Sequence, residues 1–128
     1  MPNPTVAILG ASAERRKFGN KSVRAHRHAG YDVYPVNPKA DEVEGLKSYP
    51  TLADVPVENL DRISIYLPPA VGLSMLDDIA KKGAGEVWFN PGTESPEILK
   101  LAGELGINAI TACSIVDLGV SPSQFPDE

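Results

Sequence analysis

The residues best suited to binding chemistry lie near the start of the chain, where a short apolar segment turns on a glycine. Residues 5–9 are apolar and end at Gly10, Ala11 and Ser12. A buried strand that turns on a glycine into a helix directs free backbone N–H groups and the positive end of the helix dipole at one point. The pattern predicts a site for a phosphate group at this turn.

A concentration of positive charge follows the turn. The chain has a net charge of −5, with 12 basic and 17 acidic residues, but residues 15–27 contain no acid and include Arg15, Arg16, Lys17, Lys21, Arg24 and Arg27. We expect a helix to begin at Arg15. Cations at a helix N-terminus are unfavourable unless a negative group lies nearby, so the pattern favours a bound anion. The alternative is a solvated charged face.

No set of side chains indicates catalysis or a metal site. His26 and His28 are the only histidines, and no Cys/His spacing typical of a metal site is present. Cys113 is the only cysteine, which favours a reducing, cytoplasmic setting, and we expect it to be a small buried side chain. We therefore predict no catalytic residue and no metal, and we favour a binding protein over an enzyme.

Alternating strands and helices are expected to position these residues. Strands are predicted at 5–9, 32–36, 46–49, 62–67, 86–89 and 107–112, and helices at 15–27, 71–82 and 96–105. Within the second helix, Val71, Met75 and Ile79 share one apolar stripe. Pro35 lacks a backbone N–H donor, which places its strand near a sheet edge. The alternation predicts an α/β fold with three layers: a mostly parallel sheet of five to six strands, with helices on both faces.

Turn residues follow four of the expected strands. These are Gly10-Ala11-Ser12, Asn37-Pro38, Pro68-Pro69 and Asn90-Pro91-Gly92. Ligands of parallel sheets bind beyond the carboxyl ends of the strands, near the point where the strand order reverses. The sequence therefore predicts one site at this edge, next to the basic helix.

The pattern departs from the usual dinucleotide fingerprint, which is G-x-G-x-x-G with an acid at the end of the second strand. Gly10 is followed only by Gly19, and the second strand ends at Asn37. This disfavours NAD. NADP stays open as an alternative, because Lys39 can meet a 2′-phosphate. We predict an adenine nucleotide with more phosphate than NAD.

Four segments, residues 6–12, 17–20, 30–39 and 45–56, resemble the small stand-alone CoA-binding domain proteins. These proteins are similar to the N-terminal nucleotide-binding domain of the succinyl-CoA synthetase alpha subunit. The resemblance runs from about Val6 to Cys113. It implies a Rossmann-like fold that binds CoA or acyl-CoA, with residues 1–113 as the domain and 114–128 as a C-terminal arm that packs on the surface or on a partner subunit.

The resemblance also implies which residues meet the ligand. The part that binds the diphosphate corresponds to Gly10, Ala11, Ser12 and Lys17, and we include Arg16, Gly19 and Asn20 from the same segment. The border of the adenosine and its 3′-phosphate corresponds to Asn37, Pro38 and Lys39, and the adenine wall to Leu67 and Pro68. The loop on the pantetheine side corresponds to Asn90, Pro91 and Gly92, although the family usually has Gln where Asn90 stands.

We predict a cytoplasmic, non-catalytic CoA or acyl-CoA binding protein, with an accessory or regulatory role. Its partner is a small-molecule nucleotide, with no nucleic acid and no membrane, and we allow for a homodimer through an exposed sheet edge. One alternative is an NADP-binding protein or reductase fragment. Another is an interaction subunit that senses acyl-CoA and reports through the arm. The synthetase resemblance does not extend to activity, because the phosphorylated histidine and the nucleotide-grasp domain lie outside the matched part.

Overall fold

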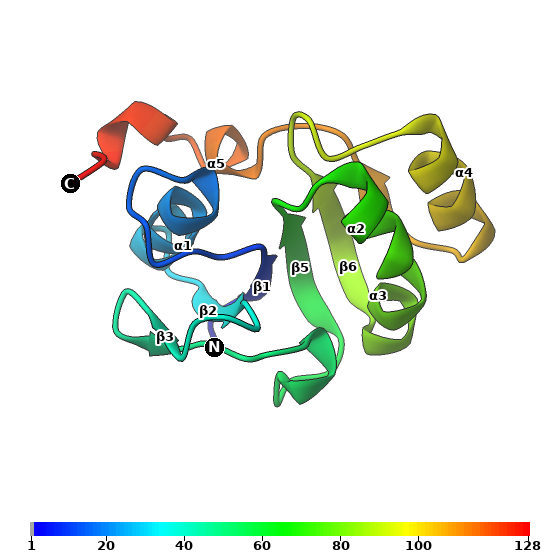
Figure 1. The fold of residues 1–128 in the computed structure, drawn as a ribbon, viewed down its shortest axis with the longest axis horizontal. Helices are drawn as coiled ribbons and strands as arrows, with labels where there is room; N and C mark the ends of the chain where they lie inside the picture. The colour runs from blue at the N-terminus through cyan, green and yellow to red at the C-terminus, as the bar shows by residue number, and fades with distance from the viewer. Residues whose placement is uncertain (1) are drawn as a thin grey trace.

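Strand β1 (Thr5–Leu9) lies inside a five-stranded parallel sheet, and its side chains are buried on both faces. The computed structural model describes residues 2–128. The strand order is β2-β1-β5-β6-β7, with the other strands at Asp32–Val36, Leu60–Ile65, Ala84–Phe89 and Ala109–Ile110. All pairs are parallel (Figure 1). The sequence of a parallel strand buried on both faces is a continuous apolar run, which is why residues 5–9 could be predicted as a strand.

Helices cover both faces of the sheet. On one face lie α1 (Phe18–His28) and the short α5 (Ser114–Asp117), and on the other lie α2 (Pro69–Ser74), α3 (Leu76–Lys82) and α4 (Pro96–Glu104) (Figure 1). Alternation along β1 divides the core, because Val6 and Ile8 pack on the α1 side while Ala7 and Leu9 pack on the other. The predicted three-layer, Rossmann-like fold is confirmed.

The strand order reverses between β1 and β5. The chain passes from β1 to the edge strand β2 and then returns to the other side of β1 as β5. Between them, β3 (Glu42–Val43) and β4 (Leu46–Lys47) form a separate antiparallel hairpin. Two connections that leave in opposite directions open a crevice at the carboxyl ends of β1 and β5.

The first helix begins later than the sequence suggested. It starts at Phe18 rather than at Arg15, and the segment before it forms a turn in which the Lys17 N–H donates to the Glu14 carbonyl at 3.1 Å. The Glu14 carboxylate pairs with Arg16 and Lys17 and stabilises this turn. Three of the cations assigned to the helix therefore precede its first turn or cap it.

The predicted helix over 71–82 is two helices. The chain bends at Met75, whose φ of −101° and ψ of −3° end α2 and begin α3. Gly72 and Ser74 are weak helix formers, which favours a break here. The bend leaves Val71 of the predicted stripe 44% exposed, while Ile79 of that stripe and Leu76 beside it are buried in the core.

Two predicted strands are shorter in the structure. Residues 46–49 contribute β4 to the hairpin, while Tyr49 makes one parallel bridge to Val36, and residues 107–112 contribute only β7. Two 3-10 helices complete the elements: η1 (Leu52–Asp54) precedes β5, and η2 (Pro122–Gln124) follows α5. Pro35 lies in the edge strand β2, as predicted. Among residues 2–128, no helix has the length and apolar character needed to cross a membrane.

Candidate functional site

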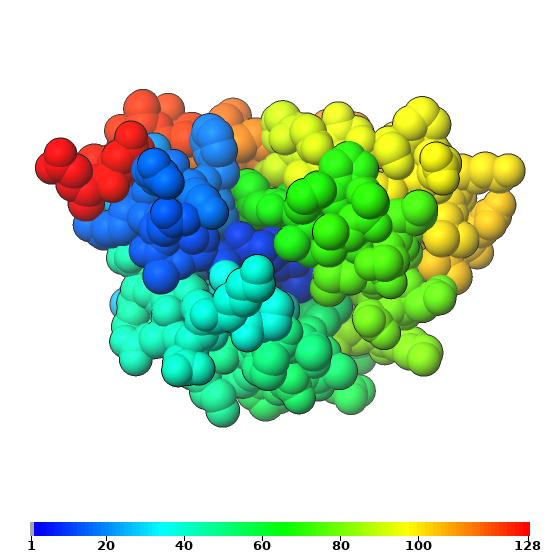
Figure 2. Space-filling view, in the orientation of Figure 1, coloured from blue at the N-terminus to red at the C-terminus, as the bar shows by residue number. Residues whose placement is uncertain are grey.

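A groove opens at the carboxyl ends of β1, β5 and β6, where the strand order reverses. Its volume is about 320 Å³, and its lining comprises Gly10, Lys17, Phe18, Gly19, Tyr66, Leu67, Pro68, Pro91, Gly92 and Thr93. Figure 2 shows the surface hollowed between the N-terminal residues, in blue, and the segment after β5, in green. The volume lies within the range of small-molecule sites, roughly 300–1,000 Å³.

The groove brings together residues from three of the four predicted strand ends. Predicted site residues in its lining are Gly10, Lys17, Gly19, Leu67, Pro68, Pro91 and Gly92. The prediction did not include Phe18, Tyr66 and Thr93, although each adjoins or nearly adjoins a residue that was named. Predicted residues outside the lining are Ala11, Ser12, Arg16, Asn20, Asn37, Pro38, Lys39 and Asn90.

Two glycines allow the end of β1 to pack closely against the segment after β5 and against the start of α1. Gly10 has a φ of 85°, and a Cβ atom there would lie 2.6 Å from the Tyr66 carbonyl oxygen. A Cβ atom on Gly19 would lie 2.2 Å from the Gly10 carbonyl oxygen. Only a residue without a side chain allows this backbone approach.

The close approach places unpaired backbone donors in the groove. Phe18 and Gly19 are the first residues of α1, so their N–H groups lack carbonyl partners within the helix. Within residues 2–128 no other hydrogen-bond acceptor meets either group. With the positive end of the α1 dipole, these donors make the local environment favourable to an anion.

Two asparagines predicted to meet the ligand hold the loop that follows β1. Asn20 Nδ2 donates to the Ser12 carbonyl at 2.9 Å, and Asn37 Nδ2 donates to the Ala11 carbonyl at 2.7 Å. The Asn37 Oδ1 atom also accepts from the Lys39 N–H at 2.8 Å. These side chains fix the course of residues 10–17, which we call the glycine loop.

Asn90 is buried beneath the loop on which it was predicted to meet the ligand. Its Nδ2 atom donates to Ser64 Oγ and to the Ile65 carbonyl, both at 2.9 Å, and its Oδ1 atom accepts from the Ser114 N–H at 2.9 Å. Tyr66 reaches the same cluster, since its hydroxyl lies 3.1 Å from Ser114 Oγ, and burial raises the Tyr66 pKa. Asn90 therefore anchors α5, while Pro91 and Gly92 reach the groove.

The basic segment has acidic partners within the chain. Glu14 pairs with Arg16 at 3.2 Å and with Lys17 at 2.8 Å, and Arg15 pairs with Glu44 at 3.1 Å. Further along α1, Lys21 pairs with Asp127 at 2.6 Å. The charge pattern by itself therefore does not require a bound anion. The free backbone N–H groups of Phe18 and Gly19 are the evidence for an anion site.

The groove lacks an acid–base pair in its lining, where Lys17 and Tyr66 are the titratable side chains. His26 is fully buried in the last turn of α1, outside the groove lining, and its Nδ1 atom donates to the Ser22 carbonyl at 2.8 Å. Burial lowers the His26 pKa to about 4. Among residues 2–128, no group of His, Cys, Asp and Glu side chains is arranged to hold a metal ion.

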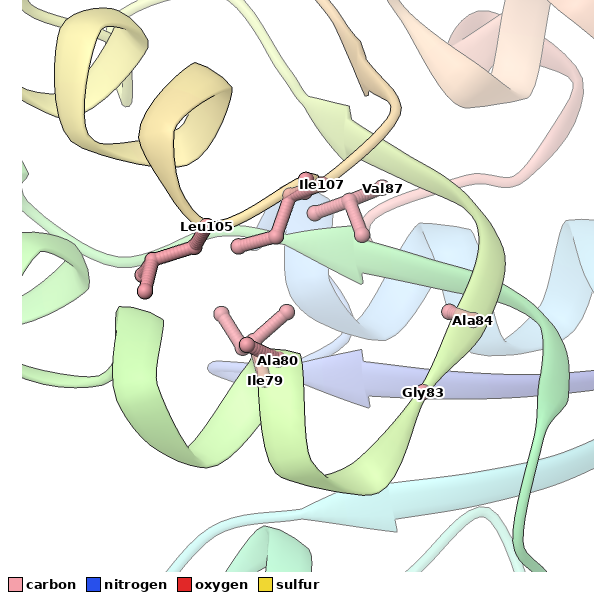
Figure 3. A pocket seen from close by; sticks show the side chains of 8 residues that line it. Ile79, Ala80, Gly83, Ala84, Val87, Leu105 and Ile107 are labelled. Carbon is pink, nitrogen blue, oxygen red and sulfur yellow. The ribbon is translucent and has the colours of Figure 1, made fainter.

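A second hollow lies at the opposite end of the sheet. Its volume is about 70 Å³, and in Figure 3 Ile79 and Ala80 of α3 face it from one side and Leu105 and Ile107 from the other. All its lining residues are apolar or glycine. It is too small for a nucleotide and lacks polar side chains that would orient one.

Known proteins are similar to this chain in sequence and in structure. The acetate–CoA ligase (ADP-forming) of Methanocaldococcus jannaschii is 35% identical over 79 residues, which cover 62% of this chain and 11% of the ligase. A conserved hypothetical protein of Pyrococcus furiosus has a solved structure that superposes with a TM-score of 0.81 at 34% identity, covering 89% of this chain and 98% of that one.

A larger solved structure contains the fold as one part. The dinucleotide-forming acetyl-coenzyme A synthetase 1 of Ca. Korarchaeum cryptofilum, in complex with phosphate and ADP, matches with a TM-score of 0.72 and 30% identity, over 86% of this chain and 26% of the synthetase. The chain thus spans a small part of the ligases and synthetases that it matches. Residues 4–119 match the family described as the CoA binding domain. The chain belongs to the CoA-binding domain family.

Proposed function

We propose that this chain binds CoA or an acyl-CoA in the groove and catalyses no reaction on it. The observation that carries the proposal is the backbone contact between Gly10 and Gly19 at the groove, where the Phe18 and Gly19 N–H groups are free at the positive end of the α1 dipole. A diphosphate is the part of CoA that such donors suit. The glycine loop and α1 would hold this diphosphate.

The opposite wall of the groove suits an uncharged part of the ligand. Leu67, Pro68 and Pro91 contribute apolar surface there. Rigid proline loops after β5 and β6 lose little conformational freedom on binding. This wall supports placing the adenine and the start of the pantetheine arm along β5 and β6, while Lys39 remains our predicted contact for the 3′-phosphate.

The absence of catalysis stays a prediction, supported by the lack of an acid–base pair in the lining. The ligases and synthetases that the chain matches are much longer, and our proposal does not include their activities. A cytoplasmic location and a homodimer also remain predictions. They rest on the single Cys113 and on the edge strand β2.

Isothermal titration calorimetry with CoA, acetyl-CoA, dephospho-CoA and NADP tests the proposal. We expect CoA and acetyl-CoA to bind, with dephospho-CoA weaker, and NADP to give no saturable heat. The Gly19→Ala variant should lose CoA binding, because its Cβ atom collides with a backbone oxygen. Gly103→Ala is the matched control, since a Cβ atom on this exposed helix residue meets nothing within 4 Å. Absence of CoA binding, or equal binding by both glycine variants, would overturn the proposal.

One contact favours a second candidate role, in which residues 114–128 report that acyl-CoA is bound. Ser114 is bonded to Asn90, and Asn90 directly precedes Pro91 and Gly92 of the groove. A ligand that moved this loop would act on α5 through that side chain. Hydrogen exchange at residues 114–117 that CoA leaves unchanged would exclude the role.

A further inference from the structure

The β3–β4 hairpin, which lies between β2 and β5 in the sequence, has an unusual residue in its turn. Its two-residue loop consists of Glu44 and Gly45, with φ values of 51° and 77°. A two-residue turn with both φ values positive strongly favours Asn-Gly, Asp-Gly or Gly-Gly. A glutamate here adopts a backbone conformation that L residues disfavour, and such strain persists only where the surroundings determine it.

The surroundings of Glu44 are specific. Its Oε1 atom accepts from Arg15 Nη2 at 3.1 Å, its Oε2 atom accepts from Asn20 Nδ2 at 3.1 Å, and its main-chain carbonyl accepts from Arg27 Nη1 at 2.7 Å. The side chain is only 18% exposed. Burial acts to raise the Glu44 pKa, but the hydrogen bonds from Asn20 and Arg15 outweigh it and the pKa is lowered, so the carboxylate is ionised at neutral pH.

These hydrogen bonds connect Glu44 to the glycine loop. The Asn20 amide that meets Glu44 also donates to the Ser12 carbonyl at 2.9 Å. On the other side, Asn20 Oδ1 accepts from Arg24 Nε at 2.8 Å, and Arg24 Nη2 donates to the Arg15 carbonyl at 2.8 Å. Glu44 therefore reaches the backbone of the loop at Ser12 through Asn20, and holds Arg15 through its side chain.

We infer that Glu44 is a positioning residue for the anion site. It does not line the groove; it fixes the glycine loop from behind through Asn20 and Arg15, so that the donors at the start of α1 stay aligned before a ligand arrives. It also pairs with Arg15, which does not line the groove. This inference rests on the proposed CoA binding, and it adds a residue outside the predicted site.

The Glu44→Asn variant separates this role from an ordinary structural one. Asparagine followed by Gly45 suits the turn better than glutamate, so the hairpin should form at least as well. The shorter side chain cannot bond Arg15 and Asn20 together. We expect roughly tenfold weaker CoA binding by calorimetry, the effect of losing a charged hydrogen bond. Hydrogen exchange at residues 11–17 of the free protein should be faster.

Two further variants complete the test. Glu44→Gln keeps an acceptor for Asn20 without the charge, and should fall between the wild type and Glu44→Asn. Glu42→Gln, an exposed change on the same hairpin, should match the wild type. Wild-type exchange at residues 11–17 in Glu44→Asn would overturn the inference whether or not CoA binds. Failure of the wild type to bind CoA would overturn the proposed function, while the exchange measurement would still decide the role of Glu44.

Discussion

At the scale of single residues, polar side chains hold the site from inside the protein more than they line it. Asn20, Asn37 and Asn90 were predicted to meet the ligand, yet each bonds to backbone or to buried side chains. An asparagine in a buried or half-buried position must satisfy its amide within the protein. The groove itself is lined mainly by glycine, proline and apolar residues.

His26 gives stability a dependence on pH. Its pKa is about 4 in the folded protein because burial disfavours the charged ring, against an ordinary value of 6.5. Between these values the unfolded chain binds more protons, so the free energy of unfolding falls as the pH falls from about 6.5 to about 4. The full contribution is on the order of 3 kcal/mol, present above pH 6.5. Urea unfolding at pH 7 and pH 5 should show about 2 kcal/mol of this difference.

Two histidine variants test whether His26 causes this pH dependence of stability. His26→Gln should be less stable at pH 7, because the ring packs edge-on against Tyr31 and accepts from Arg62, but its stability should vary less between pH 7 and pH 5. His28→Gln, at an exposed position, should keep the wild-type difference. An undiminished pH dependence in His26→Gln would show that another group is responsible.

At the scale of elements, the short α5 depends on polar side chains of β5. Alternate β5 residues, Arg62 and Ser64, face it: Arg62 pairs with Asp117 at 2.7 Å, and Ser64 Oγ lies 2.7 Å from Ser114 Oγ. Arg62 also lies 4.6 Å from the centre of the Trp88 ring. A helix of this length is not stable alone, so these contacts must hold it on the sheet.

Ser114→Ala tests this attachment. The substitution removes the partner of the Ser64 and Tyr66 hydroxyls while sparing the main-chain bond to Asn90. The Tyr66 hydroxyl would lose its hydrogen-bond partner and Ser64 would keep only the Asn90 donor, so the free energy of unfolding should fall by about 1–3 kcal/mol. Ser74→Ala, at an exposed helix end, should change it by less than about 0.5 kcal/mol. Chemical denaturation of the two variants compares them, and equal stabilities would contradict the role given to Ser114.

Elements with strong local signals were predictable from the sequence. The helix predicted over 96–105 begins at Pro96 in the structure, where Ser95 caps it: Ser95 Oγ accepts from the Ile98 N–H at 3.2 Å. The start of α1 and the bend at Met75 were not predictable. Both depend on tertiary packing, since Gly19 must approach Gly10 and Leu76 must reach the core. Local patterns carry no information on such packing.

At the scale of the whole molecule, strand order decides which predicted residues meet. The ends of β1, β5 and β6 line one groove, whereas Asn37, Pro38 and Lys39 after the edge strand β2 lie outside its lining. The sequence indicated all four strand ends but could not give their order. It also could not reveal that acids from distant segments, Glu44 and Asp127, face the basic helix.

The most direct test of the central claim is a map of CoA binding by two-dimensional ¹H–¹⁵N NMR on the intact chain. Hydrogen bonds to phosphate shift the amide signals of the donors, so we expect the largest changes at Phe18 and Gly19, with Gly92 of the lining also shifted. Residues around the small hollow, such as Ala80 and Gly106, should not change. Changes centred on that hollow or on the outer face of α1, with the glycine loop unaffected, would contradict the account.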